Sequence, residues 1–114
     1  MLAGSPVYEI VSGQILLGRK SDFISLHRDM LLPMLRAAGI EPVLCLLTEV
    51  GRYDRFLDIF RYESVERYVS QTDAFLQDER LQIYYSSVCQ CVTGHIEVEL
   101  AVEFPHLAGQ HPRV

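Results

Sequence analysis

Strand-type and helix-type hydrophobic patterns follow one another along this chain, and their order strongly limits the possible folds. Four segments are rich in β-branched and aromatic residues or alternate with a period of two, as strands do. These segments are residues 7–17, 42–50, 55–62 and 95–104. Two regions, beginning near Ser21 and Ser64, repeat apolar residues at helical spacing. The order strand, helix, strand, strand, helix, strand predicts a ferredoxin-like α+β protomer, with a four-stranded antiparallel sheet and both helices on one face.

Capping and breaking residues indicate where the helices begin and end. Ser21 and Ser64 are suited to cap helix N-termini. Gly39 can end the first helix in a left-handed conformation. Pro33 lies inside that helix, where its missing N–H is expected to kink or divide it. Asp78 is a candidate cap that restarts the second helical region.

Composition argues against several classes of protein. The 114 residues are 49% hydrophobic and 22% charged, which is typical of a globular domain and not of a disordered chain. The formal net charge of −5 disfavours nucleic acid as a partner. No apolar run approaches the roughly 20 residues that cross a bilayer, so we expect no membrane insertion. Without a secretory signal, and with three cysteines only, we expect a cytoplasmic protein with free thiols.

The patterned segments form one continuous region without repeats or linkers. We therefore expect one domain over residues 7–104. Residues 1–6 and 105–114 lack the apolar pattern and contain proline and glycine, so we expect a flexible N-terminus and a C-terminal tail.

The sheet face that the helices leave uncovered is the expected place of a site. In the third strand, Leu57 and Ile59 suit the helix-covered face. The other face is then expected to combine aromatic and acidic side chains: Glu9, Val11, Phe56, Asp58, Phe60, Tyr62, Glu97 and Glu99. Exposed aromatic residues on a sheet usually mark an interface or a ligand groove. A second copy packed there would enclose a cavity, so we expect a homodimer; a water-facing sheet with surface aromatics is the alternative.

Four residues are candidates for catalysis: His27, Glu9, Asp58 and Glu97. The pKa of histidine suits a general base at the cavity rim, whereas a buried, hydrogen-bonded core histidine is the alternative for His27. Carboxyl groups crowded in an enclosed cavity have raised pKa values and can act as acids or bases; a solvated acidic face is their alternative. The expected substrate-binding residues are Phe56, Phe60, Tyr62, Glu99 and Val11.

Cofactor and metal motifs are weak or absent in the sequence. Cys89, Cys91 and His95 form only a C-x-C spacing with one histidine, and a structural zinc site needs four ligands, so we expect no metal. The sequence has no glycine-rich phosphate loop, dinucleotide fingerprint or Gly-x-Ser-x-Gly elbow. The lack of tryptophan and of a haem-ligand motif disfavours haem chemistry. We therefore expect no cofactor.

Short motifs along most of the chain resemble the NIPSNAP family. They are Val7-Tyr8-Glu9-Ile10, Phe23-Ile24-Ser25-Leu26-His27 leading to Leu31-Leu32-Pro33, Glu49-Val50-Gly51, Phe60-Arg61-Tyr62-Glu63-Ser64, Glu66-Arg67 and Phe75-Leu76-Gln77-Asp78. The resemblance implies a dimeric α/β barrel of two ferredoxin-like protomers packed sheet to sheet. The chain departs from the family pattern at four positions. Val11 and Gly13 stand where the family has a basic residue and an aromatic residue, Asp58 stands where it often has a histidine, and Phe60 replaces a tryptophan. These departures favour a specialised pocket.

Two functions are compatible with these observations. We favour a homodimeric barrel that binds a small, partly apolar organic molecule and carries out cofactor-independent acid–base chemistry, of the cyclase or isomerase type, in biosynthesis. The wider dimeric-barrel group that the resemblance implies also contains cofactor-free monooxygenases. A non-catalytic binding or interaction module is the alternative, because a fold does not determine a function.

Overall fold

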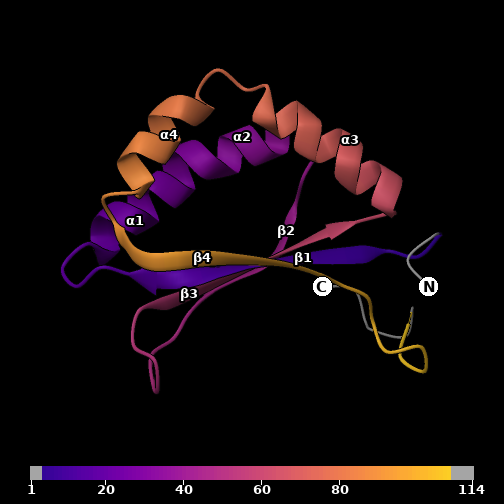
Figure 1. Cartoon of the computed structure of the whole chain (residues 1–114), viewed down its shortest axis with the longest axis horizontal. Helices are drawn as coiled ribbons and strands as arrows, with labels where there is room; N and C mark the ends of the chain where they lie inside the picture. Colours follow the sequence, from indigo (N-terminus) through magenta and orange to yellow (C-terminus); the bar gives the residue numbers. More distant parts are fainter. Residues whose placement is uncertain (1–3, 109–114) are drawn as a thin grey trace.

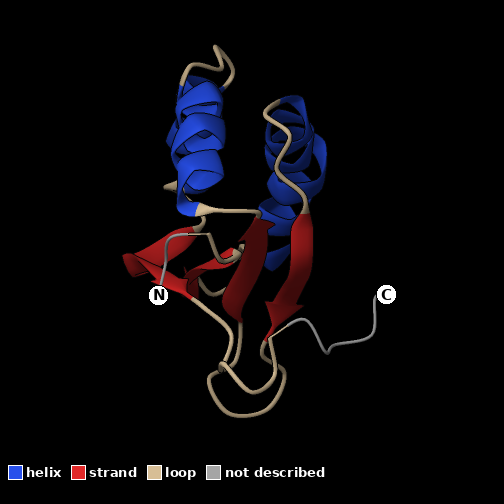
Figure 2. Cartoon of the chain, turned by 90° about the vertical axis from the view of Figure 1, so that its right-hand side faces the viewer, coloured by secondary structure: helices blue, strands red, loops and turns tan. Residues whose placement is uncertain are grey.

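A single antiparallel sheet with strand order β2-β3-β1-β4 organises the computed structural model, which describes residues 4–108. The strands are β1 (Val7–Ile15), β2 (Pro42–Leu47), β3 (Arg55–Tyr62) and β4 (Val92–Ala101). The helical segments are α1 (Lys20–Leu26), the π-helix η1 (His27–Leu31), α2 (Leu32–Ala37), α3 (Val65–Leu76) and α4 (Leu81–Val88). All of them lie on one side of the sheet (Figures 1 and 2). The ferredoxin-like α+β prediction is confirmed.

The limits of the strands differ from the prediction mainly in β4. β3 spans the predicted residues, whereas β4 begins at Val92 and ends at Ala101, where its pairing with β1 ends. Gly94, with φ of +74°, lies in the stretch of β4 where the register with β1 shifts. Gly94 therefore lies at an irregularity inside β4, whereas the predicted strand began only after it, at residue 95. Residues 1–3 and 109–114 of the two expected terminal segments lie outside the described residues.

Pro33 accounts for a widened turn in the first helical region. Proline has no N–H, so it cannot donate to the carbonyl of Asp29 as a regular α-helix requires. Instead, the N–H of Leu32 donates to the carbonyl of His27, five residues earlier, and η1 is a π-helical turn. Such turns are frequent at functional sites. Here the turn begins at His27.

The second helical region is divided as predicted. The side chain of Ser64 accepts a hydrogen bond from the N–H of Arg67 at 3.1 Å and caps α3. After α3 ends at Leu76, the carboxylate of Asp78 accepts a hydrogen bond from the N–H of Arg80 at 2.9 Å. α4 follows at Leu81. No helix in the described part of the chain has the length and apolar character needed to span a membrane.

The aromatic residues of β3 face the helices, so the prediction for this strand is wrong. Four alternate side chains of β3 are no more than 4% exposed: Phe56, Asp58, Phe60 and Tyr62. The Phe56 ring lies 4.7 Å from the ring of Phe23 in α1, and the Tyr62 ring lies 5.0 Å from that of Tyr68 in α3. Phe56 and Phe60 each belong to one of two core clusters between the sheet and the helices. The prediction failed because both sets of alternate residues in β3 include apolar side chains.

The uncovered face is instead aliphatic at its centre. Directly paired residues share a face, and the register pairs Ile10 with Ile59 and Leu46 with Leu57. Leu44 is paired with Ile59 and is also exposed. This face therefore carries an aliphatic patch, made of Ile10, Leu44, Leu46, Leu57 and Ile59.

Candidate functional site

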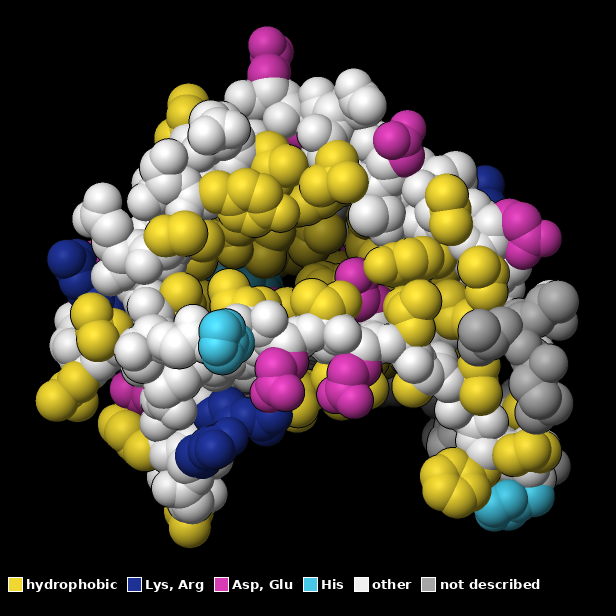
Figure 3. All heavy atoms as spheres, viewed as in Figure 1, with side chains coloured by type: hydrophobic (Ala, Val, Ile, Leu, Met, Phe, Trp, Pro, Cys, Tyr) yellow, Lys and Arg dark blue, Asp and Glu magenta, His cyan; other side chains and the backbone are white. Residues whose placement is uncertain are grey.

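A cavity of about 500 Å³ lies between the sheet and the helices of the chain. The space-filling view shows a hollow between the helix layer and the sheet, with a mainly hydrophobic lining (Figure 3). Six of the predicted site residues line the cavity: Glu9, Val11, Phe56, Asp58, Phe60 and Tyr62. The sequence analysis expected these six residues, together with Glu97 and Glu99, on the face that the helices do not cover, whereas the six lie on the helix side. The space they enclose is therefore inside the protomer and not between two copies.

Glu9 is the acidic group at the tyrosine-lined part of this cavity. Its Oε1 accepts a hydrogen bond from the hydroxyl of Tyr62 at 3.0 Å. Burial raises the pKa of Glu9, and hydrogen bonding with Tyr62 and Tyr68 offsets part of that rise. Burial, followed by the neighbouring charge of Glu9, raises the pKa of Tyr62. Glu9 therefore keeps a proton at a higher pH than an ordinary glutamate, which suits an acid–base group.

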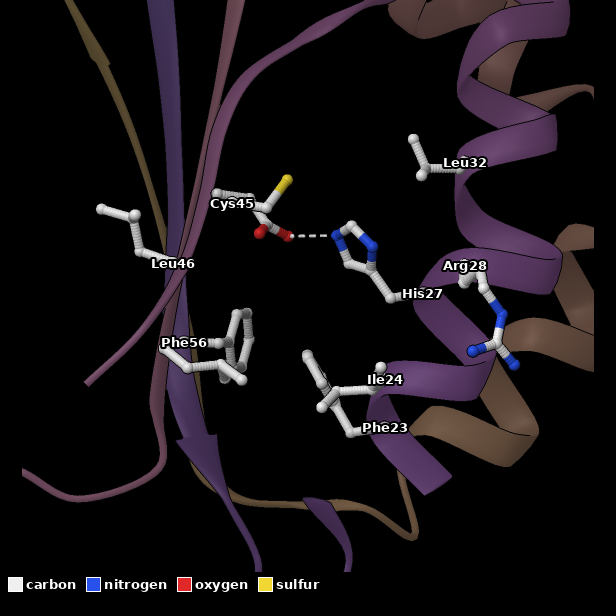
Figure 4. A pocket seen from close by; sticks show the side chains of 10 residues that line it. Phe23, Ile24, His27, Arg28, Leu32, Cys45, Leu46 and Phe56 are labelled. Atoms are coloured by element: carbon white, nitrogen blue, oxygen red, sulfur yellow. Dashed lines mark ion pairs between the residues drawn. The ribbon is translucent and has the colours of Figure 1, made fainter. Parts of the chain in front are cut away.

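His27 and Asp58 are brought together, as the sequence proposal of a shared site requires. Nε2 of His27 lies 3.3 Å from Oδ2 of Asp58, and their side chains are 15% and 6% exposed. The dashed line in Figure 4 marks an ion pair of this kind across the space between helix and sheet. His27 Nε2 is buried but has no aligned hydrogen-bond partner. The two groups are therefore close to each other without forming a well-formed hydrogen bond.

A second, smaller cavity of about 260 Å³ adjoins this pair. Asp58, Phe23 and Phe56 line both cavities, whereas His27 lines only the smaller one. Asp58 is therefore the acidic residue that both cavities share. Its carboxylate faces His27 on one side and belongs to the wall that holds Glu9 on the other.

Cys45 is a site residue that the sequence analysis missed. It is paired directly with Asp58 across β2 and β3 and lines the smaller cavity. Cys45 is an exposed residue, but partial desolvation of its thiol, together with the nearby Asp58 carboxylate, raises the pKa of that thiol to about 12. No local motif marks this residue, because its neighbourhood depends on strand register and on the helical turn opposite. The three cysteines are free; Cys45 and Cys89 are exposed and Cys91 is buried.

Glu97 and Glu99 lie apart from the other candidates. They are paired with Ser12 and Ile10 of β1, on the face that the helices do not cover. Glu97 lines a polar depression together with Arg55 and His95. The expectation that Glu97 shares a cavity with Glu9 and Asp58 is therefore corrected. β4 was assigned to the right faces, while β1 and β3 were assigned to the opposite ones.

The fold is similar to solved structures of NIPSNAP family proteins. One, from Agrobacterium tumefaciens, has a TM-score of 0.78 and 13% identity, over 88% of this chain and 94% of that chain. A NIPSNAP domain protein from Burkholderia xenovorans has a TM-score of 0.77 and 15% identity, over 87% and 95% of the two chains. The predicted resemblance to this family is thus confirmed in the fold.

Another similar structure is named for an enzyme class. A Bordetella bronchiseptica protein assigned by name to the antibiotic biosynthesis monooxygenases has a TM-score of 0.67 and 20% identity, over 88% of this chain and 98% of that chain. No protein-family model and no curated protein matches the chain. At these identities the likeness shows a shared fold, and function has to be argued from the site.

Proposed function

We propose that this chain binds a small, partly apolar organic molecule in the 500 Å³ cavity and catalyses an acid–base reaction on it. The observation that carries the proposal is the Glu9 carboxyl group, held by the Tyr62 hydroxyl in a cavity with mostly apolar walls. Apolar surroundings favour binding of an apolar body, and a few polar groups then orient it. Glu9 and Asp58 are the acidic groups in this wall.

Proton transfer by Glu9 needs no bound cofactor. The ionised carboxylate accepts a proton from a carbon next to a carbonyl group of the bound molecule. The same carboxyl group then returns the proton at another atom, which moves a double bond or accompanies ring closure. Because the pKa of Glu9 is raised, its carboxylate takes up a proton more readily than an ordinary glutamate does. Tyr62 orients the carboxylate by donating to Oε1.

The similar fold of a protein named for antibiotic biosynthesis monooxygenases supports an enzymatic role, in biosynthesis, over a purely structural one. The three free cysteines support a reducing, cytoplasmic location as part of the same proposal.

A homodimer completes the proposal. The aliphatic patch lies on the uncovered sheet face, and closed two-fold symmetry lets each copy cover the same patch of the other. A stable interface buries about 800 Å² per partner, which an entire sheet face can supply. Each cavity would still be lined by one chain.

Proton exchange in heavy water tests the catalytic part of the proposal. A panel of cyclic ketones and β-keto esters is incubated with the protein, and loss of the α-proton signal is followed by NMR. We expect exchange of at least one compound, slowed about a hundredfold or more by Glu9→Gln. Glu79→Gln, an exposed matched control, should leave the rate unchanged.

The same experiment separates catalysis from simple binding. If the Glu9→Gln variant catalyses proton exchange of the compound at the wild-type rate, Glu9 is not the acid–base group. If panel compounds bind in the cavity and none exchanges, the alternative of a non-catalytic binding module replaces the enzyme.

A further inference from the structure

Three side chains that commonly bind metal ions converge beside the smaller cavity. Nε2 of His27, Sγ of Cys45 and a carboxylate oxygen of Asp58 all lie within 4.8 Å of one another. Cys45 and Asp58 are directly paired on neighbouring strands, so their side chains leave the sheet on the same face. His27 reaches them from the π-helical turn. Figure 4 shows its ring and the Cys45 sulfur in the same space between sheet and helix.

The distance between His27 and Asp58 suits an ion between them. Their 3.3 Å contact has no hydrogen-bond alignment, and the buried Nε2 has no other partner within the described residues. A buried nitrogen in that state is costly and calls for an explanation. Two atoms that bind one tetrahedral zinc ion, at about 2.0–2.1 Å each, lie about 3.3 Å apart. The observed separation matches that of two ligands of one ion.

The local charges also favour a cation. Asp58 is 4% exposed, and in the described part of the chain its ion pair is with His27. Arg28 lines the same cavity, but its guanidinium group is already paired with Asp29 at 2.8 and 3.0 Å. No arginine or lysine among the described ion pairs thus neutralises the buried carboxylate.

We propose that His27, Cys45 and Asp58 bind one divalent cation of the zinc class. Zinc accepts nitrogen, sulfur and oxygen ligands, whereas magnesium and calcium prefer oxygen alone. Three protein ligands leave a fourth position for water or another small ligand, as in catalytic zinc sites. In this arrangement His27 Nε2 is a ligand and not the general base predicted from the sequence. This inference goes beyond the proposed function, because Glu9 takes no part in it.

Cobalt titration tests the site directly. The full-length chain, free of any affinity tag and treated with a chelator, is titrated with Co²⁺. We expect visible absorption of tetrahedral cobalt that saturates at one equivalent, with a near-ultraviolet band from thiolate-to-cobalt charge transfer. Zn²⁺ should displace the cobalt and abolish both signals.

Variants identify the ligands. Cys45→Ser should abolish the charge-transfer band and weaken binding about a hundredfold or more. Cys89→Ser, the matched control at another exposed cysteine, should retain both. His27→Gln and Asp58→Asn should each weaken binding, with circular dichroism confirming that every variant is folded.

Two results would overturn the assignment. One is a charge-transfer band that survives Cys45→Ser in folded protein. The other is a wild-type spectrum of weakly bound, six-coordinate cobalt. Because no organic molecule is present in these titrations, their failure leaves the proton-exchange test of Glu9 unaffected, and the converse also holds.

Discussion

The hydroxyl of Tyr62 donates a hydrogen bond to Oε1 of Glu9 at 3.0 Å, across the paired strands β1 and β3. Both side chains point to the helices, where the carboxylate is removed from much of its water. This contact partly compensates the burial of the carboxylate, and the burial itself makes the stability of the protein depend on pH in a predictable direction.

Glu9→Gln should remove one component of that pH dependence. Because burial raises the pKa of Glu9, this residue contributes stability while protonated, below its ordinary pKa of 4.5, and the contribution is lost as pH rises through the raised pKa. Glutamine stays neutral throughout. We therefore expect the free energy of unfolding of Glu9→Gln, relative to wild type, to increase from acid to neutral pH in urea denaturation. A constant difference across this range would contradict the direction of the shift.

Tyr62→Phe should destabilise the protein by about 1 kcal/mol, the usual net contribution of such a hydrogen bond. It should also raise the pKa of Glu9 further, because hydrogen bonding with Tyr62 lowers it in the native protein. Carbon-13 NMR of the Glu9 carboxyl group measures the pKa. Tyr53→Phe, at a tyrosine that is 55% exposed, is the control and should change neither quantity.

Gly13→Ala should destabilise the protein by about 1–3 kcal/mol, as overpacking does. A Cβ atom at this position would lie 2.7 Å from the ring of Phe56, which has little room to move in the core. The double variant Gly13→Ala/Phe56→Leu should lose less stability than the two single variants lose in sum, because the smaller leucine side chain makes room for the new Cβ atom. Strict additivity in thermal unfolding would show that the ring is not the obstacle.

Leu46→Asp should dissociate the proposed homodimer. Leu46 belongs to the aliphatic patch, is 48% exposed, and points away from the helix-side residues in Figure 4. Light scattering should report twice the chain mass for wild type at micromolar concentration and the single-chain mass for the variant. Leu17→Asp, at a leucine that is 87% exposed and outside the patch, should remain dimeric. A single-chain mass for wild type would refute the dimer itself.

Much of the fold follows from local patterns that the sequence displays. The cap at Ser64, the turn at Asp78 before α4, the widened turn at Pro33 and the alternation of β3 are each set by a few neighbouring residues. The faces of β3 are different, because Leu57 and Ile59 are as apolar as the aromatic residues that alternate with them. The set that contains the aromatic rings packs toward the helices, and the absence of a side chain at Gly13 leaves room for the Phe56 ring.

Some members of the candidate site were predictable from the sequence, but its arrangement was not. Glu9 and Asp58 were identified because the alternation of the strands places them on one sheet face with aromatic residues. Cys45 could not be identified in that way, since its position beside Asp58 depends on the register of β2 with β3. The distance to His27 depends in addition on the π-helical turn, which a regular helical period does not contain.

The position of the cavity inside a single chain determines how the proposed binding should depend on protein concentration. Its lining comes from all three of β1, β3 and β4 and from the helices of the same chain. An assembly of any size therefore has as many equivalent sites as it has chains. Saturation should follow a simple hyperbola with one molecule per polypeptide, and diluting the protein until assemblies separate should leave the affinity unchanged.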